Sequence, residues 1–247
     1  MLVGPRLEAN SVTTVRTISV TQAFVTAGKQ RQYWTINVAD EYCAIHSGTV
    51  GTPGEWQLLE NLDVESAIDS ANDLIAAKKQ AGYVLDPTFD PLAQWYFDVG
   101  EFGPHPLTTH PSFLAHFTDE LYLDIAEEES PFGSDDGAEA LVRLTTALQE
   151  DQPVDLSTFA EVIVVQKWEM PFHPPGESTD VDYWSVGGPA TTDKVIAALA
   201  FGSIKITGKV APGLKALARQ SLLRLLDNTD QPASVSRMLT DLESFAT

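Results

Sequence analysis

Cysteine and long apolar runs are scarce in this sequence, and each shortage excludes a class of protein. Cys43 is the only cysteine among 247 residues, so an internal disulfide framework is excluded and a reducing compartment is permitted. No apolar run approaches the roughly 20 residues that a membrane-spanning helix needs, and residues 1–6 lack the charged-then-apolar pattern of a secretory signal. We therefore expect a cytoplasmic protein that has no membrane partner.

Basic residues are also few: 15 Lys and Arg stand against 35 Asp and Glu, for a net charge of −20. Residues 86–160 contain a single basic residue, Arg143, and sixteen acidic ones, so this segment alone carries −15. Lys and Arg supply most of the affinity for duplex nucleic acid by neutralising phosphates, so the charge disfavours nucleic acid as a partner. It suits a basic protein partner through steering and charge complementarity, although acidity can also serve solubility alone.

The common signatures of catalysis and metal binding are missing. The chain has no Gly-x-Ser-x-Gly elbow, no Ser-x-x-Lys and no phosphate-binding loop. His105, His110 and His116 are close in sequence, but no His-Glu-x-x-His or paired-cysteine pattern accompanies them. Cys43 lies within an expected strand, where a buried and inert thiol is the usual outcome. We therefore expect no catalytic residue, no cofactor and no metal site.

The first third of the chain is predicted to form a small antiparallel sheet crossed by one helix. Alternation of apolar and polar residues places Trp34, Ile36 and Val38 on one face of a strand. Asp63 is a favourable N-cap for a helix, and Gly82 suits the position just beyond its end. Further strands are expected at residues 42–46 and 56–59, and residues 16–21 could add an edge strand.

Residues 47–51, Ser-Gly-Thr-Val-Gly, precede this helix, and residues 78–83, Lys-Lys-Gln-Ala-Gly-Tyr, close it. This order resembles the WGR domain of poly(ADP-ribose) polymerases and of several bacterial proteins, in which Trp-Gly-Arg-x-Gly precedes a helix ending in Lys-x-x-Gly-Tyr. The resemblance implies that Ser47 replaces the Trp, and that Thr49 replaces the Arg that contacts nucleic acid in DNA-binding members. Neither side chain supplies an aromatic platform or a bidentate phosphate contact. The remaining candidates for nucleic-acid contact are Arg31, Lys78 and Lys79.

Residues 86–247 are predicted to form an acidic, mainly helical domain, so we expect an α+β chain whose first domain comprises residues 1–85. Pro111 can begin a helix that the apolar spacing continues to Glu129. The apolar run at residues 162–165 predicts a buried strand. Further helices are expected through Leu141, Leu144 and Leu148 and near residues 191–207, 212–227 and 233–246, the last three after a loop at 171–190. Segments 130–137 and 195–209 resemble the C-terminal half of YfeS-type bacterial proteins, which pair a WGR-like module with a helical domain.

The acidic segment supplies the candidate binding site. On a continuous helix, Glu120, Asp124 and Glu127 or Glu128 share one face, which could bind a hard divalent cation through oxygen or contact a basic protein. We interpret this face as a partner-binding surface, with two aromatic residues further along the chain as anchors. The expected residues are Asp119, Glu120, Asp124, Glu127, Glu128, Glu129, Asp135, Asp136, Tyr183 and Trp184.

Together these patterns predict a non-catalytic protein-interaction protein. The sharper hypothesis is an immunity-type inhibitor or an adaptor that binds a basic protein partner, such as a toxin acting on nucleic acid, through residues 119–139. Two alternatives remain open. One is a WGR-type regulator that binds nucleic acid, and the other is a metal-dependent enzyme built on the helical carboxylates.

Overall fold

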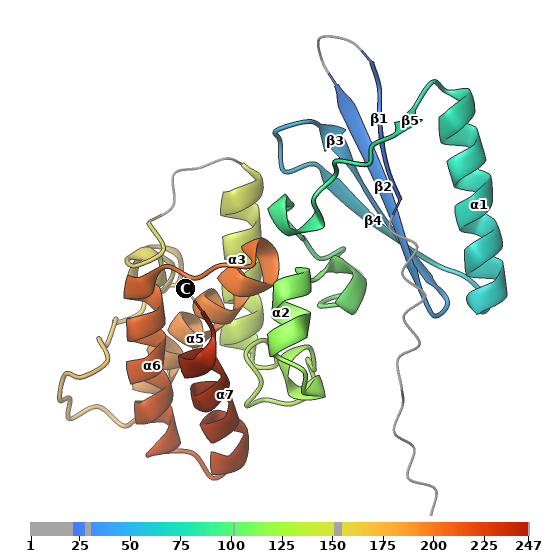
Figure 1. Ribbon diagram of the computed structural model, residues 1–247. Helices are drawn as coiled ribbons and strands as arrows, with labels where there is room; N and C mark the ends of the chain where they lie inside the picture. Colours follow the sequence, from blue (N-terminus) through green and yellow to red (C-terminus); the bar gives the residue numbers. More distant parts are fainter. Residues whose placement is uncertain (1–21, 28–30, 101, 151–154, 247) are drawn as a thin grey trace, which may run out of the picture.

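The computed structural model describes residues 22–27, 31–100, 102–150 and 155–246, and Figure 1 shows a sheet with one helix beside a group of helices. The sheet has five antiparallel strands in the order β4-β3-β2-β1-β5. This arrangement confirms the predicted α+β fold class. The strands are β1 (Gln22–Val25), β2 (Gln32–Ala39), β3 (Tyr42–Thr49), β4 (Glu55–Glu60) and β5 (Val84–Leu85), and α1 (Val64–Gln80) accompanies them.

Helix α1 covers one face of the sheet. Its N-cap is Asp63, whose carboxylate accepts the Ser66 N–H at 2.8 Å, while the Ser66 hydroxyl accepts the Asp63 N–H at 3.0 Å. Gly82 follows the helix with a φ of +89°, a backbone conformation that suits glycine. The core beneath α1 consists of Phe24, Trp34, Ile36, Val38, Cys43, Ile45, Ala67, Ala71 and Ile75. The predicted strand face, helix cap and helix end are therefore confirmed, and Cys43 is buried as expected.

Two short strands extend the sheet beyond the three that the sequence predicts. β1 pairs with β2 on one side and with β5 on the other. These strands are four and two residues long, too short to show a clear alternation of apolar and polar residues. The edge strand predicted at residues 16–21 lies outside the described residues.

Helix α5 (Pro189–Thr207) is the central helix of the remaining structure, and nearly all of its residues are buried. A Cβ atom at Gly202 would lie 3.1 Å from Leu141 Cδ1 and 3.2 Å from Leu144 Cδ2, both on α3 (Asp135–Gln149). The close approach of α3 therefore explains a glycine inside a helix. The other helices are α2 (Pro111–His116), α4 (Phe159–Glu161), α6 (Pro212–Leu226) and α7 (Pro232–Ser244). None of the described helices combines the length and the apolarity that crossing a membrane requires.

The helix predicted from Pro111 to Glu129 is wrong beyond its first turns. Helix α2 ends at His116, and the chain continues through a short 3-10 turn, η3 (Glu120–Tyr122), into an irregular segment. Aspartate side chains explain the break: Asp119 accepts the Leu121 N–H at 3.0 Å and Asp124 accepts the Ala126 N–H at 2.7 Å. Such local bonds compete with the helical pattern. The predicted common helical face of Glu120, Asp124, Glu127 and Glu128 therefore does not form.

The buried strand predicted at residues 162–165 is also wrong, because this run is helical. It continues α4 as η4 (Val162–Lys167), a π-helical segment. Ile163 and Val164 are buried, whereas Val165 is exposed, so one side of the segment packs on the core beside α5. A short β-branched run cannot be assigned to strand or helix by periodicity alone, and packing against α5 decides the outcome.

The sheet face opposite α1 packs against the segment that leads into the helices. Rings of Tyr33, His46, Trp56, Tyr96 and His110 form a continuous series, with centroid separations of 4.9, 4.3, 4.9 and 5.3 Å. Within it, His46 and Trp56 stack nearly parallel, at 9°. The series joins the sheet to the helical part of the chain. Burial lowers the pKa of His46 to about 4, so this ring is neutral at neutral pH.

Candidate functional site

An acidic depression lies where α3 begins. Glu128, Asp135 and Asp136 line it together with Gly133, Ser134 and Lys194, and its volume is about 340 Å³. Ser134 is the N-cap of α3 and its hydroxyl accepts the Gly137 N–H at 3.1 Å, which places both aspartates in the first helical turn. Carboxylates are favoured there because the N-terminal end of a helix carries partial positive charge. The structure thus brings together carboxylates from two separate parts of the predicted acidic segment. We call Glu128, Asp135, Asp136 and the neighbouring Trp184 the acidic face.

Lys194 on α5 connects these groups. Its Nζ atom lies 3.0 Å from Glu128 Oε1 and 5.4 Å from the centre of the Trp184 ring. The Trp184 side chain is 48% exposed, and its indole N–H donates to the Asn228 carbonyl at 3.0 Å. An exposed indole whose orientation is fixed by a hydrogen bond, near carboxylates, is typical of an aromatic anchor in a protein interface.

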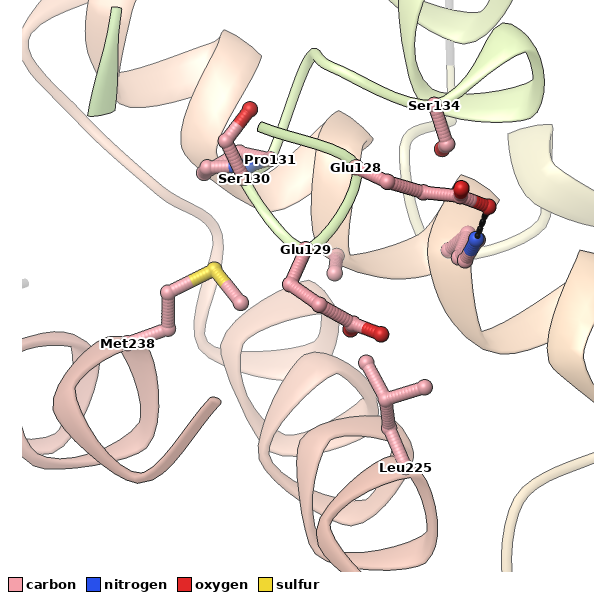
Figure 2. Close-up of a pocket in the computed structure, with 9 residues that line it drawn as sticks. Glu128, Glu129, Ser130, Pro131, Ser134, Leu225 and Met238 are labelled. Atoms are coloured by element: carbon pink, nitrogen blue, oxygen red, sulfur yellow. Dashed lines mark hydrogen bonds and ion pairs between the residues drawn. The ribbon is translucent and has the colours of Figure 1, made fainter. Parts of the chain in front are cut away.

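Glu129 does not belong to the acidic face. In Figure 2 the Glu128 side chain extends toward Ser134, whereas Glu129 turns toward Leu225 on α6. Glu129 Oε1 accepts the Thr229 hydroxyl at 3.1 Å, and Oε2 is buried without a hydrogen-bond partner among the described residues. This side chain therefore contributes to the interior and not to the surface that a partner would meet.

The other predicted partner-binding residues are spread over different surroundings. Asp119 forms an ion pair with Arg237 on α7, at 2.6 Å. Asp124 is exposed and its carboxylate accepts a backbone N–H in a turn, whereas Glu120 begins η3 and Glu127 lies in the irregular segment that follows. None of these four lines the depression at α3.

Tyr183 is placed differently from its neighbour Trp184. Its hydroxyl donates to Asp193 Oδ2 at 2.9 Å, and Arg224 donates to both oxygens of the same carboxylate, at 2.7 and 2.9 Å. Burial and the nearby Asp193 carboxylate raise the pKa of Tyr183. Tyr183 therefore belongs to an internal polar network, and its ring packs edge to face against the Trp184 ring, with centroids 5.0 Å apart.

The basic residues predicted for nucleic-acid contact lie at one end of the sheet module. Figure 1 shows the C-terminal end of α1 at the end of the sheet where β2 begins. Arg31 forms an ion pair with Asp86 at 3.6 Å. The Lys78 ammonium group lies over the rings of Trp34 and Tyr83, and the Lys79 ammonium group lies over the ring of Phe24. Each cation already interacts with a carboxylate or an aromatic ring, and this interaction lowers the affinity that the cation can add to phosphate binding.

Ser47 and Thr49 stand on β3, where the resemblance places the contact residues. The Thr49 side chain is bonded across the β2–β3 pair, since Gln32 Nε2 donates to its hydroxyl at 3.0 Å. The glycine at position 54 is required for packing. A Cβ atom there would lie 1.8 Å from the Tyr33 hydroxyl oxygen, and its φ is +70°.

Metal ligation finds no geometric support in the described part of the chain, where no three His, Cys, Asp or Glu side chains converge on a common point. The clustered histidines act separately instead. His105 and His110 each accept a backbone N–H two residues ahead, and His116 bonds the Asp241 carbonyl at 2.7 Å.

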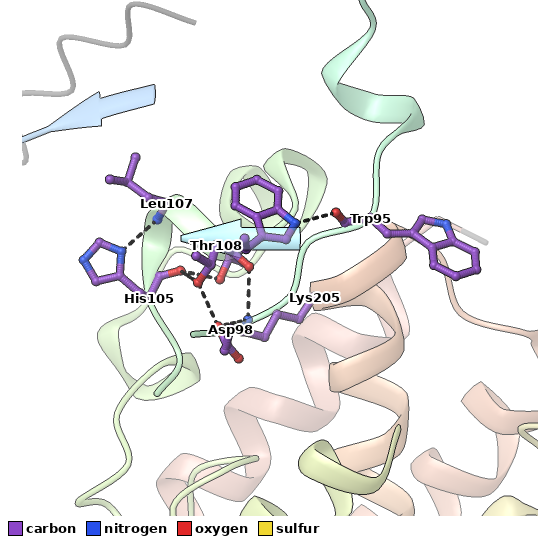
Figure 3. A network of polar contacts seen from close by, with 8 residues as sticks. Trp95, Asp98, His105, Leu107, Thr108 and Lys205 are labelled. Carbon is purple, nitrogen blue, oxygen red and sulfur yellow. Dashed lines mark hydrogen bonds and ion pairs between the residues drawn. The ribbon is translucent and has the colours of Figure 1, made fainter. Parts of the chain in front are cut away.

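One polar network was not anticipated from the sequence. Lys205, on the central helix α5, is fully buried, and its Nζ donates to Asp98 Oδ1 at 2.6 Å and to the Thr108 carbonyl at 3.3 Å (Figure 3). The Thr108 hydroxyl donates to the same carboxylate oxygen at 2.8 Å. Burial lowers the pKa of Lys205, and the Asp98 carboxylate opposes that shift. A single lysine within the apolar run of α5 is the sequence signal that could have identified this network.

Comparisons with known proteins give one match to the sheet module and one match to most of the chain. Residues 19–90 match the model of the WGR domain. Over 231 residues the chain is 36% identical to a protein of Escherichia coli (strain K12) described as "Uncharacterized protein YfeS", covering 88% of this chain and 94% of that protein.

A structural likeness adds nothing to this. A crystal structure of a Bacteroides fragilis protein aligns over 72% of this chain and 48% of its own, so this chain spans about half of that protein's length. With 18% identity and a TM-score of 0.27, the likeness carries no argument about fold or function. The sequence match is far stronger, and the chain therefore belongs to the bacterial family of WGR-domain proteins that includes YfeS of Escherichia coli.

Proposed function

We propose that this protein is a non-catalytic interaction protein, of the immunity-inhibitor or adaptor type, which binds a basic protein partner through the acidic face. The observation that carries the proposal is the meeting of Glu128, Asp135 and Asp136 in one open depression beside the exposed Trp184. Carboxylates around an aromatic anchor suit a partner that presents Lys or Arg.

The charge of the surrounding chain supports the same partner. Residues 86–160 carry −15, so a basic protein is attracted before any contact forms. Lys194 is the one cation that lines the depression, and Glu128 already pairs with it. Asp135 and Asp136 are left to receive the partner's charges.

A second candidate is nucleic-acid binding by the WGR module. The observation that favours it is the match at residues 19–90, together with Lys78 and Lys79 in the last turn of α1 and Arg31 immediately before β2. It ranks below protein binding because each of these cations has a carboxylate or a ring beside it, and because the net charge repels phosphate.

Affinity capture with two matched variants tests the proposal. The first variant neutralises the acidic face through Glu128→Gln, Asp135→Asn and Asp136→Asn. The control neutralises three exposed carboxylates on α1 through Glu65→Gln, Asp69→Asn and Asp73→Asn, so both variants change the net charge equally. Each tagged protein is incubated with lysate, in parallel samples with and without nuclease treatment, and washed across a salt series.

The proposal expects a basic protein that the wild type and the α1 control retain and that the acidic-face variant loses. Equal retention by all three proteins contradicts it. A partner that disappears on nuclease treatment, and that is lost on Arg31→Ala with Lys78→Ala, supports the nucleic-acid candidate instead.

A further inference from the structure

A groove beside α3 forms a second candidate site, which adjoins the acidic face and shares Asp135 with it. Its volume is about 460 Å³, within the range of roughly 300–1,000 Å³ that small-molecule sites occupy. Ala138, Leu141 and Val142 of α3 line the groove, and Gly100 and Gly103 line it as well. The groove shares only Gly133 and Asp135 with the depression described above.

The lining of this groove is mainly apolar. Phe132 and Leu141 are buried core residues that reach it from below. Ile125 and Val142 are 59% and 58% exposed, and both line the groove. Two large apolar side chains left in water around one groove indicate a surface that an apolar ligand would cover.

Asp98 supplies the polar end of the groove. Its Oδ1 atom accepts from both Lys205 and Thr108, which fixes the carboxylate in place. Within the described part of the chain no donor reaches Oδ2, and in Figure 3 the second oxygen lies on the side away from Thr108. The Asp98 side chain is 14% exposed, so this oxygen keeps access to a ligand while most of the residue is enclosed.

The charges around the groove define what it can accept. Among the described residues, Asp98 and Asp135 are the only ionisable ones that line the groove, and no described Lys, Arg or His does so. Both carboxylates would therefore repel an anionic ligand, whereas an ammonium group would find an acceptor held in place by Lys205.

We infer that the groove binds a small organic cation, a primary amine that carries an apolar chain or ring. Its ammonium group donates to Asp98 Oδ2, and its apolar part lies along Phe132 and Leu141 beneath the rim of Ile125 and Val142. Lys205 acts as a positioning residue, because it orients the carboxylate without touching the ligand. This site does not depend on the proposed partner binding.

Calorimetric titration of the full-length protein with four probes tests the inference. Hexylamine combines charge and apolar chain, hexanol lacks the charge, hexanoate reverses it, and ethylamine lacks the chain. The inference expects saturable binding of hexylamine, at least about tenfold weaker binding of hexanol and ethylamine, and no binding of hexanoate. Absence of saturation by hexylamine up to millimolar concentration, or equal binding of hexanol, overturns it.

Variants place the binding in the groove. Asp98→Asn keeps an acceptor oxygen but removes the negative charge, and it also breaks the ion pair with the buried Lys205, so the groove is tested as well with a variant that leaves this pair intact. Ala138→Leu fills the groove from an exposed helical position, and Ala76→Leu on α1 is its matched control. Hexylamine binding must weaken at least about tenfold in the first and stay unchanged in the second. Equal binding by both variants overturns the assignment.

The two proposals fail separately. Neutralising Glu128 and Asp136, which do not line the groove, must leave hexylamine binding intact even where it abolishes capture of a basic protein. Loss of hexylamine binding in that double variant would place the amine on the acidic face and overturn the groove assignment.

Discussion

Acidification is expected to weaken the packing between the sheet and the helical part of the chain through His46. This ring is 1% exposed, stacks on Trp56, and its Nε2 atom lies 2.8 Å from the Tyr33 hydroxyl and 2.7 Å from the Pro53 carbonyl. Burial lowers its pKa from the usual 6.5 to about 4. Protonation would leave a charge enclosed among aromatic rings.

The direction and the size of the effect follow from this gap in pKa. Above pH 6.5 neither the folded nor the unfolded chain binds a proton at His46, so the ring adds no pH dependence. Between pH 6.5 and about 4 only the unfolded chain binds it, and the free energy of unfolding falls as the pH falls. At about 1.4 kcal/mol per pH unit the full loss is about 3 kcal/mol.

Urea unfolding followed by tryptophan fluorescence, repeated between pH about 7.5 and about 4.5, measures this loss. Carboxylates titrate in the same range, so the wild type is compared with His46→Gln, whose amide can donate to the Pro53 carbonyl but does not titrate. The variant is expected to be less stable at neutral pH and to lose less stability on acidification. Parallel pH curves for the two proteins would refute the reasoning.

Three further substitutions and one control, Gly51→Ala, test the packing. Gly54→Ala should lower the free energy of unfolding by more than about 2 kcal/mol, because the new Cβ atom overlaps a neighbouring side chain and the φ angle is positive. Gly51 also has a positive φ, but no atom lies near its Cβ position, so Gly51→Ala should lower the free energy of unfolding by only about 1 kcal/mol in the same urea titration. Lys205→Met should lower it by about 3 kcal/mol, since Asp98 loses its buried partner, and an unchanged melting temperature would contradict that role. Trp56→Phe should lower the free energy of unfolding by about 1 kcal/mol, because the indole N–H no longer donates to the Trp95 carbonyl. An unchanged free energy of unfolding in chemical denaturation would show that this hydrogen bond does not stabilise the fold.

The regular elements of this fold could be predicted from sequence because local signals agree there. Trp34, Ile36 and Val38 alternate, Asp63 caps α1, and Gly82 follows it, and the structure bears out each of these. The three C-terminal helices are likewise confirmed near their predicted bounds.

The errors arise where long-range packing or side-chain bonding overrides periodicity. Asp119 and Asp124 bond the backbone locally and end the helical pattern, although the apolar spacing continues past them. Val164 belongs to a run with strand propensity, yet it is buried against helices and adopts a helical backbone. In both cases the deciding contact is invisible to a pattern of apolar residues.

The candidate site was predictable in composition but not in geometry. The sequence identifies the acidic segment and the pair Tyr183 and Trp184, but it cannot tell that one tyrosine hydroxyl turns inward to Asp193. Nor can it show that Glu128 reaches the start of α3, because the intervening residues form a turn and not a helix. The Asp98–Lys205 pair joins residues more than a hundred positions apart, which no local pattern encodes.

The most direct test of the acidic face is the rate at which the purified protein associates with the captured partner, measured across a range of ionic strength. Steering by the acidic face predicts that association of the wild type slows as salt rises. Glu128→Gln with Asp135→Asn and Asp136→Asn should reduce the rate by about tenfold at low salt and flatten its salt dependence, whereas the equally charged α1 control should stay close to the wild type. Equal rates and equal salt dependence for the acidic-face variant and the α1 control would contradict the proposed function.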